Sequence, residues 1–204
     1  MPLKLLAINC TLKPSRGKQT SSTDVLIDQL LKAFRKHGVK SEKIRAADYN
    51  ILPGVTVDEG EGDAWPAIRK KLMAADILLL GTPIWLGQPS SVCKRVLERM
   101  DAFLGETDSK GRMVTFGKVA CVCVVGNEDG AHHVTAETFQ ALNDLGFSIP
   151  ASGVAYWVGE AMGSVDYKDL KLTPAKVQEA VDTVARNASH LATVLKAEEY
   201  PGKK

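Results

Sequence analysis

The chain of 204 residues has the composition of a single globular domain, with 45% hydrophobic and 25% charged residues. Its 26 Lys and Arg residues nearly balance its 24 Asp and Glu residues, for a net charge of +2. This balance argues against a strongly basic nucleic-acid-binding protein and against a very acidic electron carrier. Because no apolar run approaches the roughly 20 residues that cross a bilayer, and the run near Met1 is too short for a secretory signal, we expect a cytoplasmic protein that binds no membrane.

The spacing of apolar residues predicts strands that alternate with helices in the first half of the chain. Strands are expected at residues 3–9, 39–46 and 76–82, and helices at residues 22–37, 64–75 and 90–104. The strand at 76–82 is apolar without alternation, which is typical of a strand buried on both faces of a parallel sheet.

The second half continues the same alternation. Strands are expected at residues 118–126 and 147–157, and a helix at residues 131–145. Pro150 and Gly153 weaken the first half of the last strand. Thr173 as N-cap and Pro174 at the first helical position predict the start of a long amphipathic helix. We therefore expect one α/β domain over residues 1–197, with a five-stranded parallel sheet covered by helices on both faces, and a polar tail over residues 198–204.

Ligands of such sheets bind beyond the carboxyl ends of the strands, which directs attention to three loops. The loop over residues 10–22 leads from a strand to a helix N-terminus, where unpaired N–H groups and hydroxyls suit a phosphate. It contains neither GxxxxGK[ST] nor GxGxxG, so it is not a triphosphate or dinucleotide loop of those types. The alternative is a solvated loop with an ordinary N-cap at Ser21 or Ser22. The candidate phosphate ligands are Thr11, Lys13, Ser15, Ser21, Ser22 and Thr23.

The loops after the third and fourth strands have the composition of a binding wall for a flat ligand. Bulky apolar residues fixed by proline and glycine at a strand's carboxyl end suit an aromatic ring, although Trp85 could instead cover a neighbouring helix as core. The polar loop that follows the fourth strand offers backbone N–H donors. The candidates are Pro83, Ile84, Trp85, Leu86 and Gly87 in the first of these loops, and Gly126, Asn127, Asp129 and Gly130 in the second.

Neither histidine nor cysteine residues predict a metal site. His132 and His133 are neighbours whose side chains diverge, and no third ligand is in register with them. The four cysteines form no CxxC motif or compact cluster. Cys121 and Cys123 would share one face of a strand, so we interpret them as buried thiols.

Taken together, the three loops resemble those of the flavodoxin-like NAD(P)H-dependent FMN reductase and quinone reductase superfamily over roughly the whole chain. The matching segments are residues 9–15 with 21–23, residues 82–87 and residues 126–130. Cys10 departs from the glycine that many members carry. The resemblance implies strand order 2-1-3-4-5, FMN with its phosphate in the first loop, and an isoalloxazine ring flanked by the other two.

The same resemblance implies an FMN-dependent NAD(P)H oxidoreductase that passes a hydride from NADPH or NADH to a small acceptor such as a quinone or free flavin. It also implies a homodimer or homotetramer. No side chain is predicted to be catalytic, because the flavin carries the redox chemistry. A flavodoxin-type electron carrier without NAD(P)H turnover and a flavin-free phosphate-binding module of the same fold are the alternatives.

The irregular segment over residues 156–170 is longer than a simple link between strand and helix, so we expect it to border the substrate space. Trp157 and Met162 are its candidate substrate-binding residues. The alternative is a surface crossover that packs on its own Trp157 and Met162.

Overall fold

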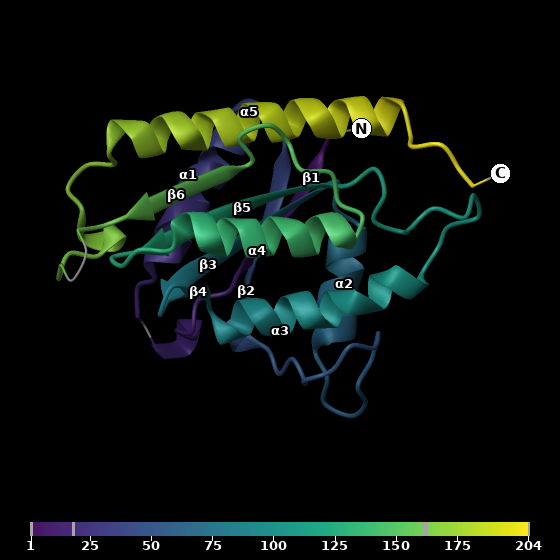
Figure 1. The fold of residues 1–204 in the computed structure, drawn as a ribbon, viewed down its shortest axis with the longest axis horizontal. Coiled ribbons are helices and arrows are strands. Elements are labelled where there is room, and N and C mark those ends of the chain that lie inside the picture. The colour runs from purple at the N-terminus through teal and green to yellow at the C-terminus, as the bar shows by residue number, and fades with distance from the viewer. Residues whose placement is uncertain (1, 18, 161–162, 204) are drawn as a thin grey trace.

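In the computed structural model, which describes residues 2–17, 19–160 and 163–203, parallel strands form the centre of the molecule (Figure 1). Their order is β2-β1-β3-β5-β6, and the short strand β4 pairs antiparallel with the end of β3. Counted without β4, this is the predicted doubly wound order. The strands are β1 (Lys4–Asn9), β2 (Lys40–Arg45), β3 (Ile77–Trp85), β4 (Gln88–Pro89), β5 (Val119–Gly126) and β6 (Val154–Val158).

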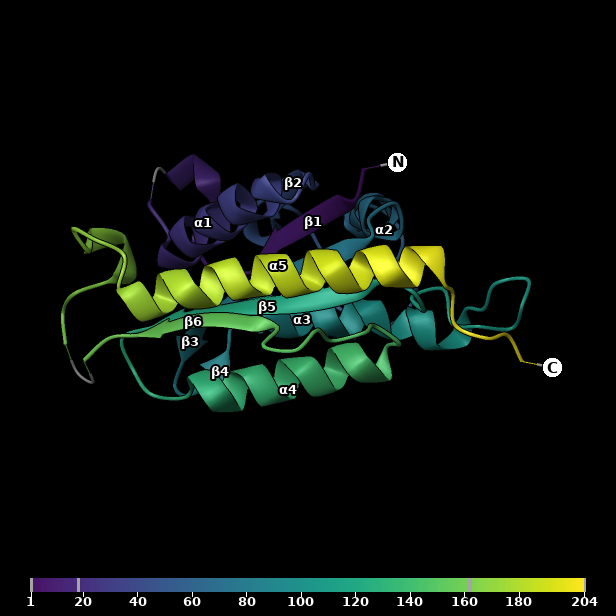
Figure 2. The same ribbon diagram turned by 90° about the horizontal axis from the view of Figure 1, so that it is seen from above.

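Helices cover both faces of the sheet, and Figure 2 shows α5 and α4 on opposite sides of the central strands. One face packs against α1 (Ser22–Lys36) and α5 (Ala175–Ala197). The other packs against α2 (Trp65–Met73), α3 (Ser91–Met100) and α4 (Ala131–Asp144). Along β1, Leu5 and Ala7 enter the first core while Leu6 and Ile8 enter the second. Because both faces of the strand are buried over residues 5–8, these four residues are all apolar.

Two predicted boundaries were wrong for identifiable reasons. The last strand begins at Val154 rather than at residue 147, because Pro150 has no N–H to donate and Ser148 makes only an isolated bridge to Val119. The cap of α5 is Pro174 rather than Thr173, whose hydroxyl instead accepts a hydrogen bond from the Gln29 side chain at 2.9 Å.

Smaller differences affect a strand end, a helix end and the tail. Strand β3 extends three residues past its predicted end to Trp85, and α3 stops at Met100, where a 3-10 turn (Asp101–Gly105) continues. The tail is held to the preceding loops, since the Arg112 guanidinium donates to the Tyr200 carbonyl at 2.9 Å. No helix in the described ranges is long and apolar enough to cross a membrane.

Candidate functional site

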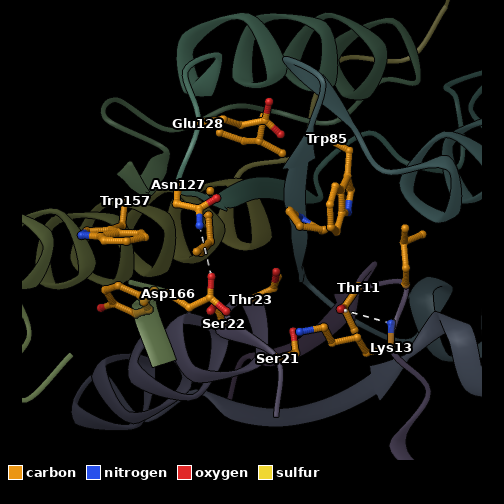
Figure 3. Close-up of a pocket in the computed structure, with 16 residues that line it drawn as sticks. Thr11, Lys13, Ser21, Ser22, Thr23, Trp85, Asn127, Glu128, Trp157 and Asp166 are labelled. Atoms are coloured by element: carbon orange, nitrogen blue, oxygen red, sulfur yellow. Dashed lines mark hydrogen bonds between the residues drawn. The ribbon is translucent and has the colours of Figure 1, made fainter. Parts of the chain in front are cut away.

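An open cavity of about 130 Å³ lies at the carboxyl ends of β1, β3, β5 and β6, beside the N-terminus of α1 (Figure 3). The three predicted loops all reach it. The residues that line it are Thr11, Leu12, Lys13, Ser21, Ser22, Thr23, Pro83, Ile84, Trp85, Val125, Gly126, Asn127, Glu128, Trp157, Asp166 and Tyr167.

Hydroxyl groups and a helix N-terminus form one end of the cavity. The Ser21 hydroxyl caps α1 by accepting from the Asp24 N–H at 3.3 Å, and the Ser22 hydroxyl oxygen accepts from the Lys168 N–H at 3.3 Å. Thr23, which is a buried residue, also lines this end of the cavity. This end therefore keeps hydrogen-bond donors available for an anion, and Lys13 adds a positive charge to its lining.

The start of the first loop is fixed without a glycine. Among the described non-glycine residues, positive φ angles occur only at Leu86 and Ser152, so the Cys10 backbone is unstrained. The Cys10 N–H donates to the Gly81 carbonyl at 2.8 Å, and the Ser90 hydroxyl donates to the Cys10 carbonyl at 2.6 Å. Burial raises the pKa of the Cys10 thiol, which keeps it a neutral core group.

A hairpin turn carries the aromatic wall of the cavity. Leu86 and Gly87 have φ angles of +53° and +74°, and they connect β3 to β4 through a two-residue turn. Trp85, directly before the turn, is 51% exposed, so it is not an ordinary core residue. The Leu86 N–H donates to the Glu128 carboxylate at 3.0 Å, which joins this turn to the loop after β5.

The opposite wall comes from the end of β6 and the segment that follows it. Figure 3 shows Trp157 and Trp85 on opposite sides of the cavity. Trp157 packs on Tyr167 with ring centroids 5.4 Å apart, and the Asn127 amide donates to the Asp166 carboxylate at 3.4 Å. The Tyr167 hydroxyl donates to the Gln29 side chain at 2.5 Å, and burial raises the pKa of this tyrosine. The segment thus both borders the cavity and packs on its own aromatic residues, while Met162 lies outside the described residues.

Five of the candidate residues lie outside the lining of this cavity. Ser15 donates from its N–H and its hydroxyl to Asp48, each at 2.7 Å, and these bonds lower the pKa of that carboxyl. Leu86 is 91% exposed, and Gly87 supports the turn without lining the cavity. Asp129 and Gly130 instead line a neighbouring hollow with His132, His133 and Tyr156.

Sequence reasoning missed several lining residues. Leu12, Val125 and Glu128 lie within or beside the predicted loops, so their positions in the sequence indicated that they are near the cavity. The sequence did not indicate that their side chains point into it. Asp166 and Tyr167 belong to the irregular segment that was expected to border the substrate space, but no pattern singled out these two residues within it.

The adjacent histidines have different partners. The His132 ring lies 3.1 Å from the Tyr156 hydroxyl, and the His133 ring lies 3.0 Å from the Gln88 amide nitrogen. Among the described residues, no group of three or more metal-ligating side chains is gathered.

Comparisons with known proteins agree with this arrangement. A family model described as NADPH-dependent FMN reductase matches residues 3–162. A curated 8-demethyl-8-aminoriboflavin-5'-phosphate synthase from Streptomyces davaonensis is 33% identical over 213 residues, covering 98% of this chain and 81% of the synthase. A divalent metal cation transporter from Mycobacterium bovis is 36% identical over 206 residues, but this chain spans only 29% of its length.

Solved structures give the same fold. The crystal structure of RosB with bound 8-demethyl-8-formylriboflavin-5'-phosphate has a TM-score of 0.88 and 32% identity, over 97% of this chain and 82% of that one. An apo NADH:FMN oxidoreductase has a TM-score of 0.68 at 16% identity, over 97% and 92% of the two chains, and so supports the fold alone. By the family match and the synthase relative, this chain belongs to the NADPH-dependent FMN reductase family.

Proposed function

We propose that this protein is an FMN-dependent NAD(P)H oxidoreductase that serves a small acceptor such as a quinone or free flavin. The observation that carries the proposal is a single cavity with anion donors at one end and an aromatic wall at the other. When bound, FMN accepts a hydride from NAD(P)H and supplies two electrons to the acceptor.

The residues present fit a flavin mononucleotide. The hydroxyl of Thr23 and the first turn of α1 would hold the phosphate, with Thr11 and Lys13 beside it. Pro83, Ile84 and Trp85, together with Gly126 and Asn127, would hold the ring. The position of Ser21, Ser22 and Thr23 in the cavity lining supports this fit, because the N-terminus of a helix leaves backbone N–H groups available to an anion.

The wall of the cavity opposite Trp85 would bind the nicotinamide of NAD(P)H or the acceptor. Trp157 and Tyr167 present apolar surface on the side of the cavity that faces Trp85. A nicotinamide or quinone ring placed against them would be oriented and partly shielded from water. No proton-transfer residue is required for the hydride itself; the Asp166 carboxylate on this side accepts from the Asn127 amide at 3.4 Å.

A second function is favoured by the synthase relative and by RosB. The name of that relative refers to a flavin phosphate altered at position 8, and the identity of 33% extends over nearly the whole chain. Under this alternative the flavin phosphate is the substrate, bound by the same end of the cavity. The two functions differ in whether the flavin is recovered unchanged.

Purified protein tests these functions in three steps. Its absorption spectrum shows whether flavin is present, and anaerobic addition of excess NADPH or NADH shows whether that flavin is reduced. Multiple turnovers with a quinone or free flavin, and recovery of unaltered FMN by mass spectrometry, are the expected results. Flavin that stays oxidised would support the electron-carrier alternative, a changed flavin mass would support the synthase-like alternative, and protein unable to bind FMN would leave only a phosphate-binding module.

We also propose that the protein forms a homodimer or homotetramer. Trp85 and the 91% exposed Leu86 present apolar surface at the mouth of the cavity, as expected for a surface that a second copy covers. Light scattering at micromolar concentration is expected to give a mass of two or four chains. Leu86→Glu should weaken this association, whereas Leu104→Glu, on the 3-10 turn after α3, should not. A monomeric wild-type protein would contradict the proposal.

A further inference from the structure

A carboxylate lies where a phosphate site would be expected to avoid one. Asp24 is in the first turn of α1, directly after the hydroxyl residues Ser21, Ser22 and Thr23. A negative side chain so near a bound phosphate would repel it. The contacts of Asp24 indicate why the site nevertheless contains it.

Three donors converge on this carboxylate. The Asn9 amide and the Lys43 ammonium each donate to Oδ1 at 2.9 Å, and the Arg45 guanidinium donates to Oδ2 at 2.7 Å. Burial by itself raises the pKa of Asp24, but the Lys43, Asn9 and Arg45 donors outweigh it and lower this pKa. Asp24 is therefore charged, and its charge is neutralised by two cations.

Two of these donors reach on into the phosphate loop. The Asn9 side-chain oxygen accepts from the Thr11 N–H at 3.0 Å, and the second Arg45 nitrogen donates to the Lys13 carbonyl at 3.2 Å. Asn9 is fully buried and the Arg45 side chain is only 13% exposed. Asp24 thus links the first turn of α1 to the ends of β1 and β2. Through them it is also linked to the backbone of the loop that runs from β1 to α1.

The linked loop residues are those that line the anion end of the cavity. Thr11 and Lys13 both line it, and neither is connected to Asp24 directly. With Arg45 and Lys43 committed to Asp24, the loop gains its geometry from hydrogen bonds rather than from an excess of positive charge.

We propose that Asp24 is a positioning residue that, through Asn9 and Arg45, holds Thr11 and Lys13 in place for the flavin phosphate and so determines selectivity for FMN over riboflavin. The inference rests on the proposed function, because it takes FMN as the ligand. It adds a residue that is not among those lining the cavity.

Asp24→Asn gives opposite results under the two roles that this carboxylate could have. If Asp24 only adds negative charge near the phosphate, the variant binds FMN more tightly. If it positions the loop, the amide loses the Lys43 and Arg45 ion pairs and FMN binding weakens. We expect a loss of about 10- to 150-fold, the range for hydrogen bonds to charged groups, with riboflavin affinity changed by less than about 3-fold.

Titration of apoprotein with FMN and with riboflavin, followed by flavin fluorescence, measures both affinities. Asp28→Asn is the matched control, because Asp28 lies one turn later on α1 and, among the residues that the structure describes, forms its ion pair with Lys43 alone, at 2.6 Å. This control should keep FMN affinity within about 2-fold of wild type. Circular dichroism and thermal unfolding establish that each variant is folded.

Arg45→Lys provides a second arm should Asp24→Asn fail to fold. Lysine keeps the charge but lacks the two-pronged guanidinium that joins Asp24 to the Lys13 carbonyl. FMN affinity should therefore fall, while riboflavin affinity should equal that of the wild type. If a folded Asp24→Asn or Arg45→Lys variant binds FMN as tightly as the wild type or more tightly, the positioning role of Asp24 is overturned. That result leaves the phosphate assignment in place. Equal affinity of the wild-type protein for FMN and riboflavin overturns the phosphate assignment within the proposed function.

Discussion

Ser22 occupies the first position of α1, where a helix tolerates a carboxylate but a phosphate site does not. Its oxygen accepts from the Lys168 N–H, which leaves its hydrogen to donate toward the cavity. Ser22→Asp should lower FMN affinity by about 10- to 150-fold, the equivalent of one charge-assisted hydrogen bond at about 1.5–3 kcal/mol. Isothermal titration measures the change.

Two comparisons separate this effect from a folding defect. An acidic residue in the first turn favours the helix dipole, so the melting temperature of Ser22→Asp should not fall. Ser22→Ala, which removes the hydroxyl without adding charge, should lose less affinity than Ser22→Asp. Equal losses for FMN and riboflavin would place Ser22 away from the phosphate.

Trp85 is the aromatic side chain best placed to meet a flavin ring, since it lines the cavity and remains half exposed. An indole close to a flavin quenches flavin fluorescence, so Trp85→Ala should brighten bound FMN or loosen it. Steady-state and lifetime fluorescence of the bound flavin measure this. Trp65→Phe, at a buried tryptophan of α2 outside the cavity lining, should leave the quantum yield unchanged. No difference between the two variants would exclude contact between Trp85 and the ring.

At the scale of elements, the β3–β4 turn and the loop after β5 meet at glycines. Gly130 has a φ of +122°, and a Cβ there would lie 2.9 Å from the Gly87 Cα. Gly130→Ala should therefore lower the free energy of unfolding by about 1–3 kcal/mol and weaken FMN binding by separating the two walls. Urea unfolding monitored by circular dichroism gives the first quantity.

A matched glycine shows what the same substitution does without the contact. Gly105 has no atom within 4 Å of its would-be Cβ and lacks a positive φ. Gly105→Ala should leave stability unchanged or raise it by up to about 1 kcal/mol. A Gly130→Ala variant as stable as this control would show that the turn and the loop can separate freely.

The elements that sequence predicted best are those buried on two faces. The unbroken apolar run of β5 alternates its side chains between the two cores, with Val122 in one and Cys123 in the other, and a strand with one solvent-exposed face would not carry such a run. Boundaries were less predictable where tertiary contacts compete with local preference. Thr173 is a residue type that commonly caps helices, yet its hydroxyl accepts a hydrogen bond from Gln29 of α1, 144 residues away in the sequence.

At the scale of the whole molecule, topology brought the predicted loops to one edge of the sheet, because the carboxyl ends of parallel strands share that edge. Which side chains then point into the cavity depends on contacts that sequence does not encode locally. Ser15 carries the same hydroxyl as Ser22, but this hydroxyl donates to Asp48, 33 residues away in the sequence, and Ser15 does not line the cavity. Tyr167 reaches the cavity only because Trp157 and Gln29 hold it there.

The stability of the whole chain includes a buried ion pair that fastens the acidic loop before α2. The Arg99 guanidinium lies 2.8 Å from the Asp63 carboxylate, and both side chains are 0% exposed. Burial alone raises the pKa of Asp63, but the N–H groups of Glu59, Trp65 and Leu52 and the Arg99 guanidinium outweigh it and lower this pKa to about 2. The charged form is thus favoured in the folded state.

Because the folded-state pKa of Asp63 lies below its ordinary value of 3.8, its contribution to stability is present above about pH 4 and is lost as the pH falls toward 2. The contribution is at most about 2.5 kcal/mol, from a shift of nearly two pH units. Asp63→Asn leaves Arg99 buried without its partner and should cost about 3–5 kcal/mol at pH 7. It should also lose less stability than the wild type between pH 4 and pH 2.

Urea unfolding at pH 7, 4, 3 and 2.5 measures both effects, and the difference between wild type and variant removes the contribution of other carboxyl groups. Asp58→Asn is the control, since Asp58 lies in the same loop and its carboxylate accepts from the nearby Gly60 N–H and from no other described residue. That control should follow the wild-type curve because its carboxyl group is not part of the buried pair. If the wild type and Asp63→Asn lose stability in parallel as the pH falls, the acid sensitivity of the molecule arises elsewhere than at the pair between Asp63 and Arg99.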